Sequence, residues 1–323
     1  MKKPLPTKTK EAKVCAILTA DWHLSTQRPS ARTDNWIESM SSAIEEIYHL
    51  HLQYDCPILI AGDLFHKWNE QPEAINPFLR WMKNEPEPFV YAIPGQHDLP
   101  YHSYKDVDKS SYWTLVQAEA IVDIPPGYSK EIHDPYPMRI HGFPYGFPLK
   151  PLEKPHDLLL EVALVHAYLW NDSTGYVNAP VESHVNESKK PSRGYDVIVY
   201  GDNHIPFERK LKDRIIFNCG SLMRRNIDQI AYKPSVGLLH TDGTIVRHYL
   251  KEGLGTFVEP TEGITSDFDW SRLKGELEQL STGTLNFEEL LHQAIEAAMS
   301  DLTSEVRSLI LDSISKKFRK KNT

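Results

Sequence analysis

Five short apolar segments of this chain are each followed closely by an Asp or a His, and this repeated ending constrains the fold more than any other feature. The segments cover residues 14–20, 57–61, 89–93, 160–165 and 196–200. Apolar runs of this length that are rich in Val and Ile are typical of strands buried on both faces of a sheet. Apolar side chains near helical spacing predict a helix over 35–52, and 72–83 is a second helix candidate. This alternation predicts an α/β fold with layered sheets.

The remainder of the chain predicts a hairpin, two loops and a helical end. After about residue 210 short strands follow, with Asp242-Gly243 as a hairpin turn. Stretches 125–157 and 171–195 are rich in Pro, Ser and polar residues and predict long surface loops. Residues 286–318 repeat apolar side chains at helical spacing, which predicts two helices. We therefore expect a main domain at 1–250 and a C-terminal helical appendage at 251–323, whose apolar faces either pack on the core or dock a partner's coiled coil.

Composition excludes several classes of protein. A chain of 323 residues can bury a core without disulfides. The 36 Lys and Arg against 44 Asp and Glu give a net charge of −8, which excludes a protein that coats nucleic acid through bulk positive charge. An enzyme acting on DNA through bound cations and local basic patches stays open.

Cysteine usage and apolar runs indicate the compartment. Cys15, Cys56 and Cys219 are far apart and odd in number, so we expect free buried thiols rather than a zinc ribbon or a disulfide framework. No apolar run approaches the roughly 18 residues of a membrane span. The apolar run at 14–20 is too short for a signal peptide. The expected location is cytoplasmic, with no membrane contact.

The polar residues that follow the five apolar segments form one candidate site, because α/β proteins place their sites at the carboxyl ends of the strands. These residues are Asp21, His23, Asp63, Gln96, His97, Asp98, His166, Asp202 and His204. Carboxylates mixed with imidazoles bind first-row divalent metals such as Mn, Fe or Zn. Two such ions would polarise a phosphoryl group and lower the pKa of a shared water. Each fragment alone is common, but five in order after buried strands predict a dinuclear metal site.

The order D-x-H, G-D, G-Q-H-D, H and G-D-x-H resembles the motif set of the calcineurin-like metallophosphoesterases over roughly residues 14–250. This resemblance implies a four-layer α/β/β/α sandwich with a dinuclear metal site. It also implies the metal ligands: Asp21, His23 and His204 for the first ion, His166 for the second, and Asp63 bridging the two.

Two positions depart from the family pattern, and both fall on the second ion. Gln96 stands where the family has Asn, and Asp202 stands where it has His. Two divalent ions are still expected. Because oxygen ligands favour hard ions, Mn²⁺ or Mg²⁺ is favoured over Zn²⁺ at the second position. Loss of the second ion is the alternative.

The resemblance further implies two catalytic residues. His97 would lie near the scissile phosphate, where it stabilises the transition state or protonates the leaving oxygen. Asp98 would orient it.

Two further stretches resemble the SbcD-type DNA-repair nucleases, which include the Mre nuclease of eukaryotes and archaea. Residues 62–66 read GDLFH, and residues 218–225 read NCGSLMRR, in a form like that of phage-encoded members, with Cys219 in place of Pro. This resemblance implies Mn²⁺-dependent exo- or endonucleolytic cleavage of DNA in repair, recombination or replication. It also implies an SMC-like ATPase partner of the SbcC or Rad type, and a homodimer.

Direct signals for a nucleic-acid substrate are fewer. Ser221, Arg224 and Arg225 are candidate substrate contacts, although the arginines are equally consistent with a surface pair. Trp68 and Tyr101 follow site motifs, where aromatic rings either stack on bases or pack the loops.

Two other functions stay open at this stage. The first is a phosphatase or small-molecule phosphodiesterase on the same scaffold, because fold does not decide between substrates. The second is a DNA-end-binding subunit that Gln96 and Asp202 have made a weak catalyst.

Overall fold

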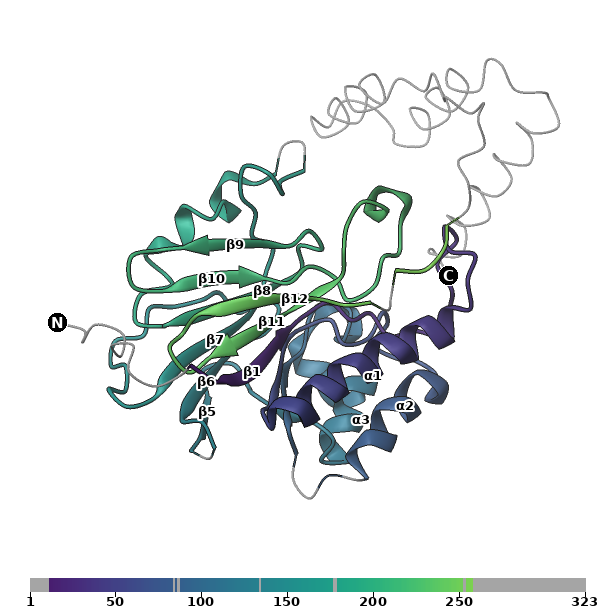
Figure 1. Cartoon of the computed structure of the whole chain (residues 1–323), viewed down its shortest axis with the longest axis horizontal. Coiled ribbons are helices and arrows are strands. Elements are labelled where there is room, and N and C mark those ends of the chain that lie inside the picture. The colour runs from purple at the N-terminus through teal and green to yellow at the C-terminus, as the bar shows by residue number, and fades with distance from the viewer. Residues whose placement is uncertain are drawn as a thin grey trace, which may run out of the picture. The chain divides into compact units, whose positions relative to one another are not determined.

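The computed structural model describes residues 12–257 apart from 84, 86, 87, 134, 177, 178, 252 and 253 (Figure 1). They belong to one compact unit of the chain, Met1–Val258. The two expected C-terminal helices lie outside the described residues, so the appendage at 251–323 stays a prediction.

The strands form two six-stranded mixed sheets. The first has the order β12-β11-β1-β2-β3-β4, and its strands are β1 (Val14–Thr19), β2 (Ile58–Ala61), β3 (Val90–Ile93), β4 (Val122–Asp123), β11 (Ser235–His240) and β12 (Ile245–Tyr249). The second has the order β5-β6-β7-β8-β10-β9, and its strands are β5 (Ser129–Ile132), β6 (Met138–Phe143), β7 (Leu160–His166), β8 (Val197–Gly201), β9 (Phe207–Lys210) and β10 (Ile215–Asn218). All five strands predicted from the apolar segments are present, each within a residue of its predicted ends.

The two sheets pack face to face through a fully apolar layer. Its members include Leu18, Leu59, Ile93, Leu164 and Val199, each 0% exposed. Complete burial of such a side chain contributes about 1.5–3 kcal/mol relative to leaving it exposed. The other faces of these strands are buried as well, which is why their sequences run apolar without alternation.

Three helices cover the outer face of the first sheet (Figure 1): α1 (Trp36–Tyr54), α2 (Pro72–Met82) and α3 (Ser111–Gln117). The side chain of Asn35 caps α1 by accepting a hydrogen bond from the backbone N–H of Glu38. Met40 and Ile44 then point into the core at helical spacing. Both predicted helices are confirmed. No helix in the described part of the chain is long and apolar enough to cross a membrane.

The outer face of the second sheet is covered by loops rather than by long helices. Their apolar side chains, such as Leu149, Leu169 and Val185, pack against the sheet. Within the described residues this layer contains only single-turn 3₁₀ helices, at Val181–Ser183 and Glu187–Lys189. The predicted α/β sandwich is thus confirmed, with a thinner cover on its second sheet.

Residues 125–157 were expected to form a surface loop, and that expectation is wrong because they contain β5 and β6. The exposed β5 is an edge strand, so its polar residues carry no signal of burial. In β6, Arg139 and His141 are accommodated by Glu161 on β7, at 2.5 Å and 2.8 Å. A sequence pattern does not reveal such partners.

The three cysteines are all free and buried, as predicted. Burial raises the pKa of each thiol to about 12, which keeps it protonated and unreactive.

Candidate metal centre

Sharp turns at the strand ends aim the predicted ligands at one edge of the sandwich. Asp21, His23, Asp63 and Asp202 have φ angles of 53°, 47°, 52° and 79°. Asp and His enter this left-handed region more readily than most residues. Backbone strain of this kind concentrates at functional sites, where the surrounding structure holds it in place. The strand ends therefore place four of the predicted ligands through an uncommon backbone conformation.

The motif glycines make room for the side chain of His166. Its Nδ1–H donates to the carbonyl oxygen of Ala61 at 2.7 Å, which directs Nε2 into the site. A Cβ on Gly62, whose φ is +90°, would lie 2.1 Å from Nδ1 of His166. A Cβ on Gly95 would lie 2.1 Å from Oδ1 of Asp63. Neither glycine can carry a side chain without displacing a predicted ligand.

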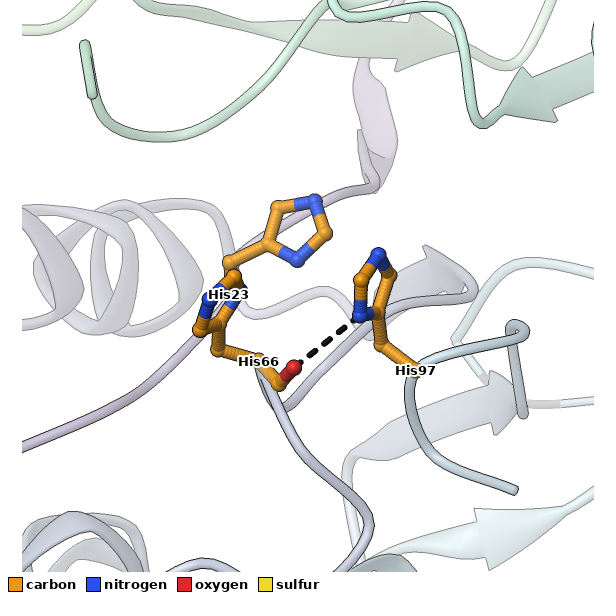
Figure 2. Close-up of side chains that lie close together, drawn as sticks. All are labelled: His23, His66 and His97. Carbon is orange, nitrogen blue, oxygen red and sulfur yellow. Dashed lines mark hydrogen bonds between the residues drawn. The ribbon is translucent and has the colours of Figure 1, made fainter. Parts of the chain in front are cut away.

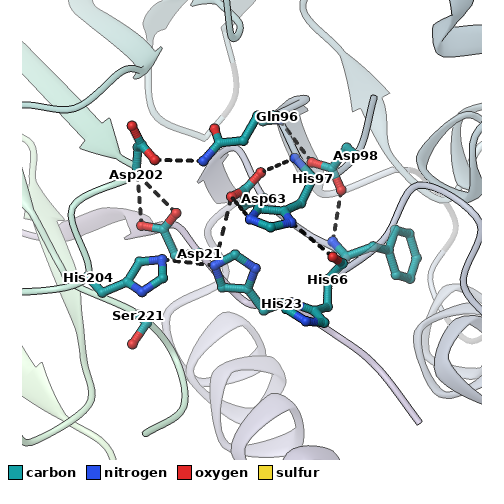
Figure 3. A network of polar contacts seen from close by, with 12 residues as sticks. Asp21, His23, Asp63, His66, Gln96, His97, Asp98, Asp202, His204 and Ser221 are labelled. Atoms are coloured by element: carbon teal, nitrogen blue, oxygen red, sulfur yellow. Dashed lines mark hydrogen bonds and ion pairs between the residues drawn. The ribbon is translucent and has the colours of Figure 1, made fainter. Parts of the chain in front are cut away.

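A first group of ligand atoms comes from Asp21, His23 and His204, which lie within 4.8 Å of one another. Nε2 of His23 is 3.0 Å from Nε2 of His204 and 3.8 Å from Oδ2 of Asp63 (Figure 3). Burial lowers the pKa of both imidazoles, which favours their neutral, metal-binding forms.

A second group lies on the other side of Asp63. Oδ1 of Asp63 is 3.5 Å from Nε2 of His166, and the same Nε2 is 2.7 Å from Oε1 of Gln96. The Gln96 amide also donates to Oδ1 of Asp202 at 2.6 Å. The backbone N–H of Asp202 donates to the carboxylate of Asp21, and this hydrogen bond links the second group of ligands to the first.

The chemistry of these atoms fits a pair of divalent cations. Oδ2 of Asp63 is buried and has no hydrogen-bond partner among the described residues. Burial alone would raise the pKa of Asp63, but the imidazole of His166 holds it well below its usual range, so the carboxylate is ionised. A buried anionic oxygen without a partner is unfavourable unless a cation is present. The mixture of imidazole and carboxylate donors suits Mn, Fe or Zn.

His97 lies at the open side of this centre. Its side chain is 37% exposed, and Nε2 is 3.9 Å from Oδ2 of Asp63. Nδ1 is 3.0 Å from the carbonyl oxygen of His66 and donates to it (Figure 2). This contact orients the ring with Nε2 toward the site.

His66 belongs to this cluster, although the sequence did not single it out as a site residue. A ligand atom of His66 lies within 4.8 Å of those of His23 and His97 (Figure 2). Its Nδ1 is buried and finds no hydrogen-bond partner in the described part of the chain. Burial lowers its pKa to about 4. The only sequence signal was its place at the end of GDLFH.

The buried carboxylate of Asp98 bonds to backbone N–H groups, whereas the ring of His97 bonds to the carbonyl of His66. The Asp98 carboxylate accepts hydrogen bonds from the backbone N–H groups of Leu64, Phe65 and Gly95, at 3.1, 2.8 and 2.9 Å. Burial and the neighbouring Asp63 raise its pKa to about 7. Asp98 thus ties the loop after β2 to the loop that carries His97, and the His66 carbonyl is the group that contacts the His97 ring.

The three candidate substrate residues occupy different surroundings. Ser221 lies beside His204 (Figure 3). It is buried, and its hydroxyl donates to the carbonyl of Met223. The guanidinium of Arg224 donates to the carbonyls of Leu254 and Ile230. Arg225 donates instead to the carbonyl of His23 at 3.2 Å, next to the metal centre. The pair is therefore split, and only Arg225 contacts a residue of the centre.

The aromatic residues near the motifs are also divided. The Tyr104 hydroxyl contacts Asp123, and its ring packs edge-on against Phe147, which is a packing role. Tyr101 is 86% exposed and lies 6.4 Å from the ring of Trp68. Tyr101 is therefore available to a ligand, and Tyr104 is not.

A family model described as calcineurin-like phosphoesterase matches residues 17–206. An archaeal phosphodiesterase is similar in structure with a TM-score of 0.38 and 15% identity, covering 73% of this chain and 99% of that one. A Staphylococcus aureus protein provisionally assigned as a 5′-nucleotidase has a TM-score of 0.44 and 12% identity, covering 82% of this chain and 58% of that one.

A third similar structure is the sulfate thiohydrolase SoxB of Thermus thermophilus, with a TM-score of 0.43 and 10% identity, covering 91% of this chain and 62% of that one. This chain thus spans about three fifths of the length of SoxB and of the Staphylococcus protein. No curated protein matches its sequence.

Proposed function

This chain belongs to the calcineurin-like phosphoesterase family, a family of phosphoric ester hydrolases, and we propose that its substrate is the phosphodiester backbone of DNA. The proposed activity is Mn²⁺-dependent exo- or endonucleolytic cleavage of the SbcD type, serving repair, recombination or replication. In this reaction water attacks phosphorus, one P–O ester bond breaks, and the leaving oxygen takes up a proton.

The position of Asp63 supports the two-ion centre on which this proposal depends. One of its oxygens faces His166 at 3.5 Å, and the other faces His23 at 3.8 Å and His97 at 3.9 Å. A carboxylate whose two oxygens face separate groups of ligands is suited to join two ions. The two groups are Asp21, His23 and His204 on one side and His166, Gln96 and Asp202 on the other.

Two bound ions supply Lewis-acid polarisation of the phosphoryl group and a water of lowered pKa. The protein's own residues position the reactants around them. His97 presents Nε2 to the open side of the site, where it would hydrogen-bond a phosphate oxygen or give a proton to the leaving oxygen. The carbonyl of His66 fixes the His97 ring, and Asp98 fixes the loop that carries it.

Arg225 supports a polyanionic substrate. Its guanidinium lies 5.1 Å from the Trp36 ring and bonds to the carbonyl of His23, which holds it next to the metal centre. Burial lowers its pKa to about 10, and Arg225 therefore stays charged at neutral pH. A protein of net charge −8 needs local cations of this kind to bind DNA phosphates.

The resemblance of residues 62–66 and 218–225 to SbcD-type nucleases supports the remaining parts of the proposal. These are an SMC-like ATPase partner and a homodimer. The free buried thiols support the proposed cytoplasmic location. Ser221 and Arg224 belong to the proposed substrate loop through the same resemblance.

The first experiment measures hydrolysis of labelled linear DNA and of methyl p-nitrophenyl phosphate with and without Mn²⁺. Asp63→Ala should abolish cleavage, whereas Asp157→Ala, at an exposed carboxylate outside the centre, should not. Ester hydrolysis without DNA cleavage would replace the nuclease with a small-molecule phosphodiesterase. DNA binding without either activity would favour the end-binding subunit.

A further inference from the structure

A cavity of about 740 Å³ lies directly beside the metal centre. Asp202 and His204 form part of its wall, so a group bound there would be attached to, or next to, a phosphate held at the centre. This volume falls within the range of about 300–1,000 Å³ that is typical of small-molecule sites. The other residues that line the cavity are neither proposed metal ligands nor His97, so the metal centre does not explain them.

Four tyrosines stand among polar and small residues in the remaining walls. Tyr168, Tyr176, Tyr232 and Tyr249 all line the cavity. Tyr176 is 59% exposed and Tyr249 is 55% exposed, which is unusual for large aromatic side chains gathered in one place. The rings of Tyr168 and Tyr176 lie 5.1 Å apart and are tilted by 46° to one another, so each presents its own face. Flat aromatic faces of this kind suit a planar ligand.

The aromatic walls are fastened to the loops that carry the metal ligands. Asn203 lies between Asp202 and His204, and its amide donates to the carbonyls of Leu169 and Thr174 at 2.8 and 3.3 Å. This fixes the loop of Tyr168 and Tyr176 against the centre. On the other side, the hydroxyl of Tyr232 donates to the carbonyl of Ser221. Cavity and metal centre therefore hold a fixed relation to one another.

We propose that this cavity binds the nucleobase of the nucleotide whose phosphate lies at the metal centre, with Tyr176 and Tyr249 as stacking residues. The inference rests on the proposed function and adds to it a binding site for the base of the substrate. An uncharged planar base is compatible with the carboxylate of Asp202 in the wall, whereas an anionic group would be repelled. Exposed Lys233 at the cavity supplies positive charge for a neighbouring phosphate.

The test compares two probes that differ only by the base. Dissociation constants for deoxyadenosine 5′-monophosphate and for 2-deoxyribose 5-phosphate are measured by calorimetry with the whole chain in Mn²⁺. The wild type should bind the nucleotide about tenfold more tightly, the size of effect that one base stacked on an aromatic side chain produces. Tyr176→Ala and Tyr249→Ala should each weaken binding of the nucleotide and leave the affinity for the sugar phosphate unchanged.

Two control variants make the result specific. Tyr176→Phe keeps the ring and should keep wild-type affinity. Tyr128→Ala removes a tyrosine that is 70% exposed outside the cavity and should have no effect. Equal affinity for the two probes, or equal weakening of both by Tyr176→Ala, would overturn the proposal.

This test is separable from that of the nuclease. DNA cleavage together with equal affinity for the two probes would overturn the cavity assignment and leave the nuclease standing. Base-dependent binding in a protein that cleaves no DNA would support the assignment of the cavity to a nucleobase and refute the proposed nuclease activity.

Discussion

Gln96 and Asp202, the two residues that depart from the family's motif pattern, contact one another: Nε2 of Gln96 lies 2.6 Å from Oδ1 of Asp202. The other end of the same amide places Oε1 2.7 Å from Nε2 of His166. The side chain of Gln96, longer than the Asn of the family pattern, thus reaches from the imidazole of His166 to the carboxylate of Asp202, which stands where the family has His. The two departures act as one pair, because each supplies the partner that the other requires.

Changing one member of this pair should therefore be worse than changing both. Gln96→Asn shortens the side chain and removes its contact with Asp202, so we expect affinity for the second ion to fall about 10- to 100-fold. The double variant Gln96→Asn, Asp202→His should recover binding and shift its preference from Mn²⁺ toward Zn²⁺, since a nitrogen replaces an oxygen donor. Metal titration by calorimetry measures both effects. Gln53→Asn, on the exposed face of α1, serves as control, and additive losses in the double variant would refute the coupling.

Gly95→Ala should abolish metal binding without a change of charge. The added Cβ would lie 2.1 Å from Oδ1 of Asp63 and 2.6 Å from Nε2 of His166, so one of these ligands must move. We expect bound metal to fall well below that of the wild type by elemental analysis. Gly127→Ala serves as the control: its φ of +83° makes the added Cβ strain the backbone, but that Cβ would meet nothing within 4 Å, so bound metal should stay unchanged even if stability falls. Full metal content in Gly95→Ala would contradict the assigned ligands.

His97→Ala should separate turnover from metal binding. Its imidazole lies at the open side of the centre, so removing it should lower kcat by about 10²- to 10⁴-fold, as expected for a general acid. Bound Mn²⁺ should stay unchanged. His133→Ala, whose side chain is 72% exposed, should alter neither quantity. Unchanged turnover in His97→Ala would remove His97 from the mechanism.

Arg225→Ala and Arg224→Ala should fail in different ways. Arg225 lies beside His23, so its loss should weaken DNA binding and reduce the slope of log K against log salt by about one phosphate contact. Arg224 donates to the carbonyls of Leu254 and Ile230, so its loss should lower the free energy of unfolding by about 1–3 kcal/mol and leave the salt slope intact. Salt-dependent binding and urea unfolding measure the two effects. A reduced salt slope in Arg224→Ala alone would reverse the assignment.

Glu161 should make stability dependent on acid. Burial alone would raise its pKa, but hydrogen bonds from His141 and Arg139 outweigh burial and lower it to about 2, from an ordinary value of 4.5. Because the folded pKa is the lower one, the ionised carboxylate stabilises the fold above pH 4.5, and that contribution is lost as the pH falls toward 2. Glu161→Gln should therefore lower the free energy of unfolding by about 3 kcal/mol at pH 7, with a smaller deficit in acid. Urea unfolding at several pH values checks this, and a deficit that does not change with pH would contradict it.

The sequence alone determined the strands that carry the site and the order of the ligands along the chain. Continuous apolar runs such as 14–20 and 196–200 have no exposed face, so their burial is legible in the residue types themselves. Asp21, His23 and Asp63 closely follow such strands, and the carboxyl ends of parallel strands such as β1 and β2 share an edge of the sheet. The motif order also predicted the family, which the match over residues 17–206 establishes.

Only the tertiary structure decided which side chains touch. It joined Gln96 to Asp202 across more than a hundred residues, directed Arg225 to the centre and Arg224 away from it, and revealed His66 beside His97. It also folded β6 from a polar stretch, because Glu161 on the neighbouring strand pairs with its Arg and His. Each of these contacts depends on a partner that is distant in the chain. The interaction energy of two such residues depends on both of them and on their geometry, so neither residue type alone predicts it.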